Sequence, residues 1–138
     1  MDPSDTILST IDYARLQPLV RDAIVSGSTP QYLIAALEAK LKHARVVEPE
    51  QMPADVVTMN SQVRVRDLDI DEVETYTLVY PSFADIAEGN LSVLTPIGAG
   101  VLGHVKGATI DMELPYGFSR VRIEDVHFQP ESVGQYDV

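Results

Sequence analysis

The chain has 138 residues, 45% of them hydrophobic, which is enough for one compact domain with a small appendage. It has no cysteine, and this excludes disulfides and thiolate metal sites. It has no apolar run long enough to span a bilayer and no basic region followed by an apolar core near its start. We therefore expect a soluble cytoplasmic protein with no signal peptide and no contact with membranes.

The formal net charge is −11, and it is distributed unevenly. Residues 1–55 carry five basic and eight acidic side chains, whereas residues 56–138 carry five basic and thirteen acidic ones. Because nucleic-acid affinity depends on neutralising phosphates, this balance argues against direct binding of DNA or RNA. Composition alone leaves two interpretations open: a protein partner with a basic surface, or a charge excess that only confers solubility.

The first predicted helix lies in the first third of the chain. Apolar residues at loosely helical spacing run from Ile11 to Ile24, and either Thr10 or Asp12 is expected as the N-cap. Pro18 interrupts this pattern, so we expect a kink or a late start.

A second helix is predicted after a break at residues 26–30. Ser28 is followed three residues later by Gln31, which resembles a capping box. Leu33, Leu37 and Leu41 then form an apolar stripe at helical spacing. Residues 1–45 therefore predict an antiparallel helical hairpin with a tip of small residues, and the sequence leaves open whether this hairpin packs on the rest of the chain.

The hydrophobic period changes after a linker that contains Pro49 and Pro53. Alternating patterns predict strands at 57–65, 73–79, 91–94, 109–114 and 120–128, with a turn at 114–117 joining the last two. One short helix among antiparallel strands predicts an α+β domain over residues 46–138.

Residues 98–103 match the G-x-G-x-x-G spelling of a dinucleotide-binding loop. That motif needs a strand, a glycine turn and a long helix whose N-terminus binds the pyrophosphate. A strand before Gly98 is plausible, but Gly103 and Gly107 leave room for only about two helical turns. The pattern therefore favours a short buried helix over a nucleotide site.

Residues 67–71 imitate the first half of a calcium loop. An EF-hand loop starting at Asp67 needs glycine at its sixth position and glutamate at its twelfth, where this chain has Glu72 and Leu78. A solvated turn between two strands is the better interpretation.

The three histidines, His43, His104 and His127, lie in different predicted elements and have no neighbour at metal-ligand spacing. We interpret them as surface or edge residues. No serine has a nucleophile-elbow setting, and no residue pair suggests a nucleophile with its base. The residues themselves predict a binding module with no catalytic residue, metal or cofactor.

Three separated segments closely resemble the Rnk-type regulators of nucleoside diphosphate kinase, which are relatives of the Gre transcript cleavage factors: 55–63 (DVVTMNSQV), 91–103 (LSVLTPIGAGVLG) and 113–117 (ELPYG). The resemblance covers most of residues 46–136, and over 1–45 it is one of layout. It implies an FKBP-like domain at 46–138, a short coiled-coil hairpin at 1–45, and binding at the secondary channel of bacterial RNA polymerase.

In the Gre family, the loop before the short helix docks on the rim of that channel. The resemblance therefore implies that the partner-binding residues are Ser92, Thr95, Pro96, Ile97 and Gly98. Family members usually carry a different residue where Gly100 stands and an acidic one where Ala108 stands. These departures affect the expected contact and leave the expected fold unchanged.

Gre factors carry acidic residues at the hairpin tip that help to hold a catalytic magnesium ion. Here Asp22 lies about one helical turn away, arms of about 13–15 residues span only about 20 Å, and the tip itself consists of Ser26, Gly27, Ser28, Thr29 and Pro30. The resemblance thus implies a channel occupant that does not stimulate transcript cleavage. An FKBP-like peptidyl-prolyl isomerase and a direct regulator of nucleoside diphosphate kinase stay open as alternatives.

Overall fold

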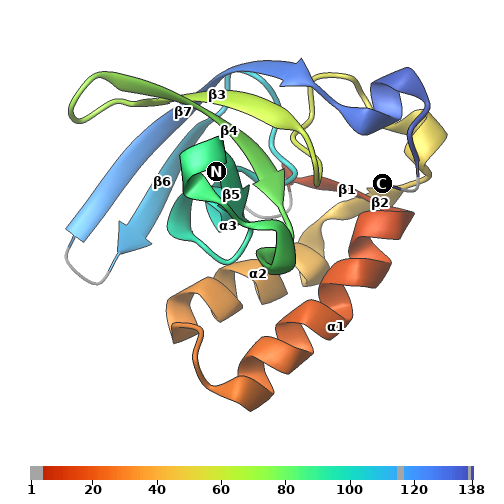
Figure 1. Ribbon diagram of the computed structural model, residues 1–138, viewed down its shortest axis with the longest axis horizontal. Helices are drawn as coiled ribbons and strands as arrows, with labels where there is room; N and C mark the ends of the chain where they lie inside the picture. Colours follow the sequence, from red (N-terminus) through yellow and green to blue (C-terminus); the bar gives the residue numbers. More distant parts are fainter. Residues whose placement is uncertain (1–4, 115–116, 137) are drawn as a thin grey trace.

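The computed structural model describes residues 5–114, 117–136 and 138. Two short strands flank the first two helices, and a sheet with one short helix follows (Figure 1). The helices and strands are β1 Ile7–Ser9, α1 Thr10–Ser26, α2 Gln31–His43, β2 Arg45–Val47, β3 Gln62–Asp67, β4 Glu72–Val79, β5 Asn90–Ser92, α3 Pro96–Val101, β6 Thr109–Leu114 and β7 Gly117–Phe128. Single 3-10 turns lie at η2 Pro49–Gln51, η3 Pro81–Phe83, η4 Ile86–Glu88 and η5 Pro130–Val133.

The main sheet has five strands in the order β5-β4-β3-β7-β6. Neighbouring strands in this sheet are antiparallel, except β4 and β5, which are parallel. The α+β class is therefore confirmed, but the prediction of a purely antiparallel sheet is wrong. The pair is parallel because the connection from β4 runs back beside that strand, so that β5 begins next to Thr77 and then runs in the same direction as β4. The short parallel pair of β1 and β2 was not predicted, because a strand of three residues has no readable period.

The strand predicted at 57–65 is wrong at its start, since β3 begins only at Gln62. The backbone amide of Thr58 donates to the Ser61 Oγ atom at 3.0 Å, and Asn60 adopts a left-handed φ of 68°. These features make a tight turn at residues where the apolar pattern alone predicts extended chain. The predicted turn at 114–117 includes residues 115 and 116, which lie outside the described residues.

The helix boundaries depend on local capping, and two capping predictions are wrong. Ser9, not Thr10 or Asp12, caps α1, because its side chain accepts a hydrogen bond from the Asp12 amide at 2.9 Å. The helix starts there and continues through Pro18, so the expected late start is also wrong. Pro30 precedes α2 and makes no side-chain capping bond, so Ser28 does not form a capping box.

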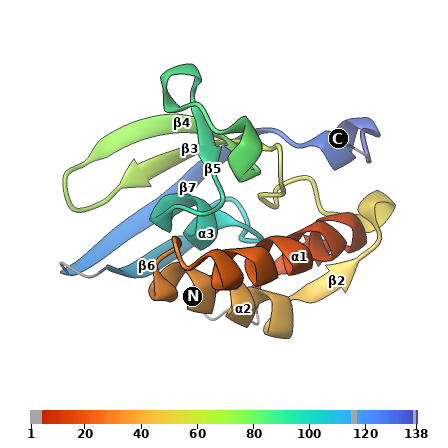
Figure 2. The same cartoon turned by 60° about the horizontal axis from the view of Figure 1, so that its bottom comes forward.

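The helix pair, by which we mean α1, α2 and their connection at 27–30, packs against α3 and against the short strands β1 and β2 (Figures 1 and 2). β3 alternates between exposed and buried side chains, as a strand covered on one face does. One buried cluster joins both parts, and each fully buried Leu, Ile or Val contributes about 1.5–3 kcal/mol. Its members include Leu16, Val20, Leu33, Ile34 and Leu37 from the helix pair, and Val63, Val65, Val101, Leu102, Val121 and Ile123 from the rest.

Candidate partner-binding site

The loop that leads into α3 is held in one shape by Thr95. Its hydroxyl donates to the carbonyl oxygen of Ser92 at 2.7 Å and accepts from the amide of Gly98 at 3.1 Å. Thr95 is the N-cap of α3, and Pro96 occupies the first helical turn, where its missing N–H costs nothing. A Cβ atom at Gly98 would overlap the Ser92 carbonyl oxygen, so only glycine fits there. The loop is therefore rigid before any partner binds.

The apolar side chains of this loop are only partly available to a partner. Pro96 and Ile97 are both half-buried, and Ile97 packs against the buried cluster. α3 itself has six residues, and Gly98, Ala99 and Val101 are buried in it. The prediction of a short buried helix at this position is confirmed, and the helix is far too short for a dinucleotide-binding unit.

Lys40 connects the helix pair to the other end of α3. This α2 residue is 5% exposed, and its Nζ atom donates to the carbonyl oxygens of Ala99, Gly100 (2.9 Å) and Leu102 (2.7 Å). Carbonyls at a helix C-terminus lack partners within the helix and carry partial negative charge, so an ammonium group satisfies both needs. Burial lowers the pKa of Lys40 to about 7.

Asp12 forms a second buried polar link, from α1 to the segment before β3. Its Oδ2 atom accepts from the amide of Met59 at 3.1 Å, and its Oδ1 atom accepts from the Tyr80 hydroxyl at 3.5 Å. Burial raises the pKa of Asp12 to about 7, although the hydrogen bond from Met59 opposes that rise. Lys40 thus joins α2 to α3, and Asp12 joins α1 to Met59 and Tyr80.

The connection between the two helices presents no carboxylate. Gly27 ends α1 with a left-handed φ of 71°, and its amide donates to the Ala23 carbonyl at 3.2 Å. The hydroxyls of Ser26 and Ser28 lie 3.2 Å apart. Asp22 is exposed on α1 behind them, and the members of the tip, Ser26, Gly27, Ser28, Thr29 and Pro30, are exposed except for the half-buried Thr29.

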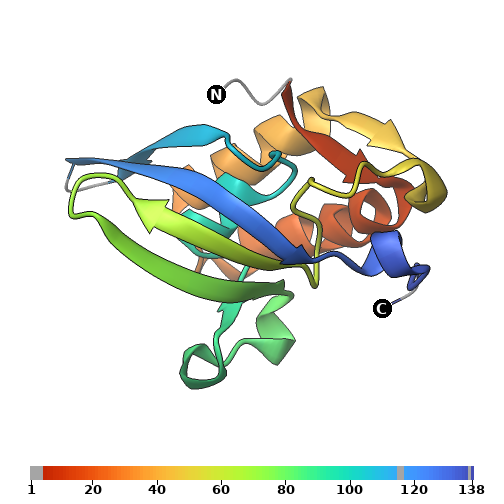
Figure 3. The ribbon, with the colours of Figure 1, turned by 90° about the horizontal axis from the view of Figure 1, so that it is seen from above.

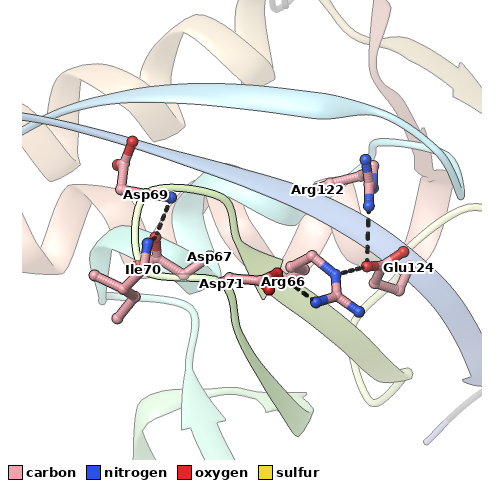
Figure 4. A network of polar contacts seen from close by, with 7 residues as sticks. All are labelled: Arg66, Asp67, Asp69, Ile70, Asp71, Arg122 and Glu124. Carbon is pink, nitrogen blue, oxygen red and sulfur yellow. Dashed lines mark hydrogen bonds and ion pairs between the residues drawn. The ribbon is translucent and has the colours of Figure 1, made fainter.

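The acidic segment 67–71 is a strand-connecting turn, as predicted (Figure 4). The Asp67 carboxylate accepts from the backbone amide of Asp69 at 2.9 Å, which closes the turn. Asp71 pairs with Arg66 at 2.6 Å, and Arg66 also bonds Glu124, whose pKa it lowers. These carboxylates therefore serve the turn and its ion pairs.

The histidines lie far from one another in the fold. His43 ends α2 and is exposed, and His127 lies on β7 with its Nε2 atom 3.7 Å from an Asp125 oxygen. His104 is only 3% exposed, so the expectation of a surface residue is wrong for it, and burial lowers its pKa to about 3. Over residues 5–114, 117–136 and 138, no group of three or more metal-ligating side chains could hold an ion.

Sequence reasoning missed four residues that the structure brings forward. Lys40 and Asp12 are charged residues on the buried faces of their helices. The sequence could have indicated them, because each lies at helical spacing from the apolar residues of its own helix. Phe83 and Ile86 are large apolar residues that lie exposed between β4 and β5, outside every predicted element. Nothing in the sequence pattern predicts that exposure.

The family follows from comparison with known proteins. A model of the family described as "Transcription elongation factor, GreA/GreB, C-term" matches residues 52–128, which is more than half of the chain. The chain therefore belongs to the GreA/GreB transcription elongation factor family. The resemblance to that family identified from the three sequence segments is confirmed.

Within the family, the chain is similar to the "Regulator of nucleoside diphosphate kinase" of Escherichia coli (strain K12), with 38% identity over 131 residues and 94% of each protein covered. It is 37% identical over 93 residues to the transcription elongation factor GreA of Clostridium botulinum (strain Alaska E43 / Type E3), covering 67% of this chain and 58% of that protein. A solved structure of the transcription elongation factor GreA/GreB from Nitrosomonas europaea superposes with a TM-score of 0.71 at 38% identity, covering 89% of this chain and 99% of the other.

None of the helices in the part of the chain that the structure describes is long and apolar enough to cross a membrane.

Proposed function

We propose that this protein is a transcription regulator that binds bacterial RNA polymerase at the rim of the secondary channel. It docks through the loop that contains Ser92, Thr95, Pro96, Ile97 and Gly98, which we call the docking loop. Its helix pair enters the channel without stimulating transcript cleavage. Membership of the GreA/GreB family supports the partner. The rigid loop beside α3 supports the docking element, because a preorganised contact costs less entropy on binding. It binds no DNA or RNA directly and needs no cofactor.

The observation that carries the non-cleaving part of the proposal is the chemistry of the tip. The connection at 27–30 offers hydroxyl groups and backbone only, and Asp22 lies back along α1. Magnesium prefers carboxylate oxygens, and a hydroxyl cannot act as a general base near neutral pH. The helix pair is also short, since the 17 residues of α1 span about 25 Å. A tip of this kind fills space without supplying a carboxylate to a metal.

The test is a binding measurement between the full chain and purified core RNA polymerase. We expect saturable binding, with an association rate that falls between low and physiological salt, because an acidic protein gains rate from steering toward a basic surface. A control with an unrelated acidic protein of equal charge separates specific binding from nonspecific attraction. If the chain does not bind core polymerase at any salt concentration, the proposal is wrong.

A second candidate function is direct control of nucleoside diphosphate kinase. The supporting observation is the 38% identity to the regulator of nucleoside diphosphate kinase of Escherichia coli. A direct regulator changes the kinase rate in a mixture of the two purified proteins, whereas a transcriptional one changes only the amount of kinase. A steady-state assay of phosphoryl transfer with and without a molar excess of the chain distinguishes them.

A peptidyl-prolyl isomerase is disfavoured by the position of the aromatic residues. An isomerase pocket of the FKBP type is lined with aromatics, but the phenylalanines Phe83, Phe118 and Phe128 are all exposed, at 67%, 78% and 38%. Of the tyrosines, Tyr13, Tyr32, Tyr76 and Tyr80 pack against the buried cluster. Exposed rings on separate segments do not enclose a proline. A tetrapeptide isomerisation assay that gave a rate above the uncatalysed one would restore this alternative.

A further inference from the structure

The connection between β4 and β5 displays two large apolar side chains on the outside of the molecule. Phe83 is 67% exposed and Ile86 is 66% exposed, and neither belongs to the buried cluster or packs against it. Single exposed apolar residues are common and need no explanation. Two of them lie within four positions of one connection, which we call the 81–88 loop after the residues that form it.

The 81–88 loop is ordered by its backbone and not by its side chains. The amide of Phe83 donates to the Tyr80 carbonyl at 2.9 Å, which forms η3. Asp85 and Asn90 exchange two backbone hydrogen bonds, each of 2.9 Å, and these close η4. The side chains of Phe83 and Ile86 make none of these bonds, so the backbone of the loop is held in place without them. A rigid loop with exposed apolar side chains loses little entropy when a partner covers it.

The parallel pairing of β4 and β5 brings the Phe83 end of this loop to the end of the strand pair from which the loop at Thr95 also leaves, whereas Ile86 lies before Asn90, at the start of β5. Val79 pairs with Ser92, and the Val93 amide donates to the Val79 carbonyl at 2.9 Å. The chain leaves β4 toward Phe83 at the end of the strand pair where it also leaves β5 toward Thr95. Figure 3 shows the green β4–β5 connection protruding beyond the β4 edge of the sheet, away from the other strands.

The charges of the 81–88 loop define the kind of surface that would cover it. Asp85 and Glu88 are both exposed, and the loop has no basic residue. An apolar pair bordered by two carboxylates complements an apolar depression bordered by lysine or arginine. Such a surface also suits the rest of this acidic chain.

We infer that the 81–88 loop is a second docking element, in which Phe83 and Ile86 insert into an apolar depression with a basic border on the same polymerase surface that receives the loop at Thr95. This inference rests on the proposed function and deepens it. It would also add exposed apolar side chains to the contact, because Pro96 and Ile97 are themselves half-buried.

The experiment compares three full-length proteins for equilibrium binding to purified core RNA polymerase: the unmodified chain, the Phe83→Ser/Ile86→Ser double variant, and the matched control Phe118→Ser. Phe118 is 78% exposed at the start of β7, at the end of the sheet opposite to the docking loop. Because all three side chains are exposed, the variants should keep the thermal unfolding midpoint. We expect the double variant to bind about tenfold more weakly and the control to bind within about twofold of the unmodified chain.

Each other outcome overturns the inference in a recognisable way. Equal binding by the unmodified chain and the double variant overturns the inference alone and leaves the proposed function intact. Failure of the unmodified chain to bind overturns both. Light scattering tests a second copy of the chain as the occupant: a dimer that the double variant abolishes, with unchanged polymerase binding, would assign the loop to self-association instead.

Discussion

The Nζ atom of Lys40 lies 2.7 Å from the carbonyl oxygen of Leu102, and this contact joins residues 62 positions apart in the chain. Lys40 belongs to the helix pair, and Leu102 ends the short helix whose other end carries the docking loop. This buried ammonium group therefore helps, together with the buried cluster, to fix the helix pair relative to the docking loop. We expect the helix pair and the docking loop to move together when a partner binds.

Replacing Lys40 with methionine should lower the free energy of unfolding by about 1–3 kcal/mol, because the buried carbonyls at the end of α3 lose their donor. Urea unfolding followed by circular dichroism measures the change. Lys42→Met is the matched control, since Lys42 is exposed on the same helix and should change stability by no more than about 0.5 kcal/mol. Equal effects of the two substitutions would contradict a structural role for the Lys40 contacts.

Asp12 should make stability depend on pH between about 4 and 7. Burial raises its pKa from 3.8 to about 7, so in this window the folded chain holds a proton that the unfolded chain has lost. Stability from this group is therefore present at low pH and falls as the pH rises toward 7, where the loss is complete. Asp12→Asn removes the titration.

The measurement for Asp12 is the urea midpoint at several pH values between 4 and 7. We expect the midpoint of Asp12→Asn, minus that of the unmodified chain, to increase across the window. Asp22→Asn, at an exposed position of the same helix, should show a constant difference. Parallel curves for Asp12→Asn would mean that the Met59 amide keeps Asp12 charged when folded.

Gly98→Ala should destabilise the protein by at least about 2 kcal/mol, because a methyl group there would overlap the backbone oxygen of Ser92. Gly100→Ala is the matched comparison within the same helix. Its added methyl would meet the Sδ atom of Met112 at 3.0 Å, and a flexible side chain can move away. Thermal unfolding of both variants should rank Gly98→Ala well below Gly100→Ala, and the opposite order would refute the close-approach argument.

The missing carboxylates at the tip lead to a prediction about transcript cleavage. Added to a backtracked elongation complex, the chain should not accelerate RNA cleavage, because residues 27–30 supply no carboxylate for a metal. An excess of the chain should slow cleavage that a Gre factor stimulates, since both would occupy the same entrance. End-labelled transcripts resolved on a gel report both results.

Two outcomes of that assay would contradict the proposal. Cleavage stimulated by the chain alone would refute the non-cleaving role. Unchanged Gre-factor activity at a saturating excess would refute the shared site and leave binding elsewhere on the polymerase.

Several elements were predictable because their signal is local. The strand predicted at 109–114 matches β6, and that predicted at 73–79 differs from β4 by one residue, since alternation reflects a sheet with one covered face. The family was also identifiable from three short segments. The start of β3 was not, because a turn stabilised by Ser61 and Asn60 interrupts an apolar run.

The sequence by itself determined the helices, most strands of the main sheet, the family and the absence of acidic residues from the tip, because these depend on residue type and on spacing along the chain. Only the tertiary structure decided that Lys40 joins the helix pair to the end of α3 and Asp12 joins it to Met59, and that Phe83 and Ile86 lie outside the core. The physical reason is that burial depends on which distant residues cover a side chain. Lysine is a residue type that is usually solvated, and Lys40 is buried only because the end of α3, far along the chain, supplies three carbonyl oxygens for its charge.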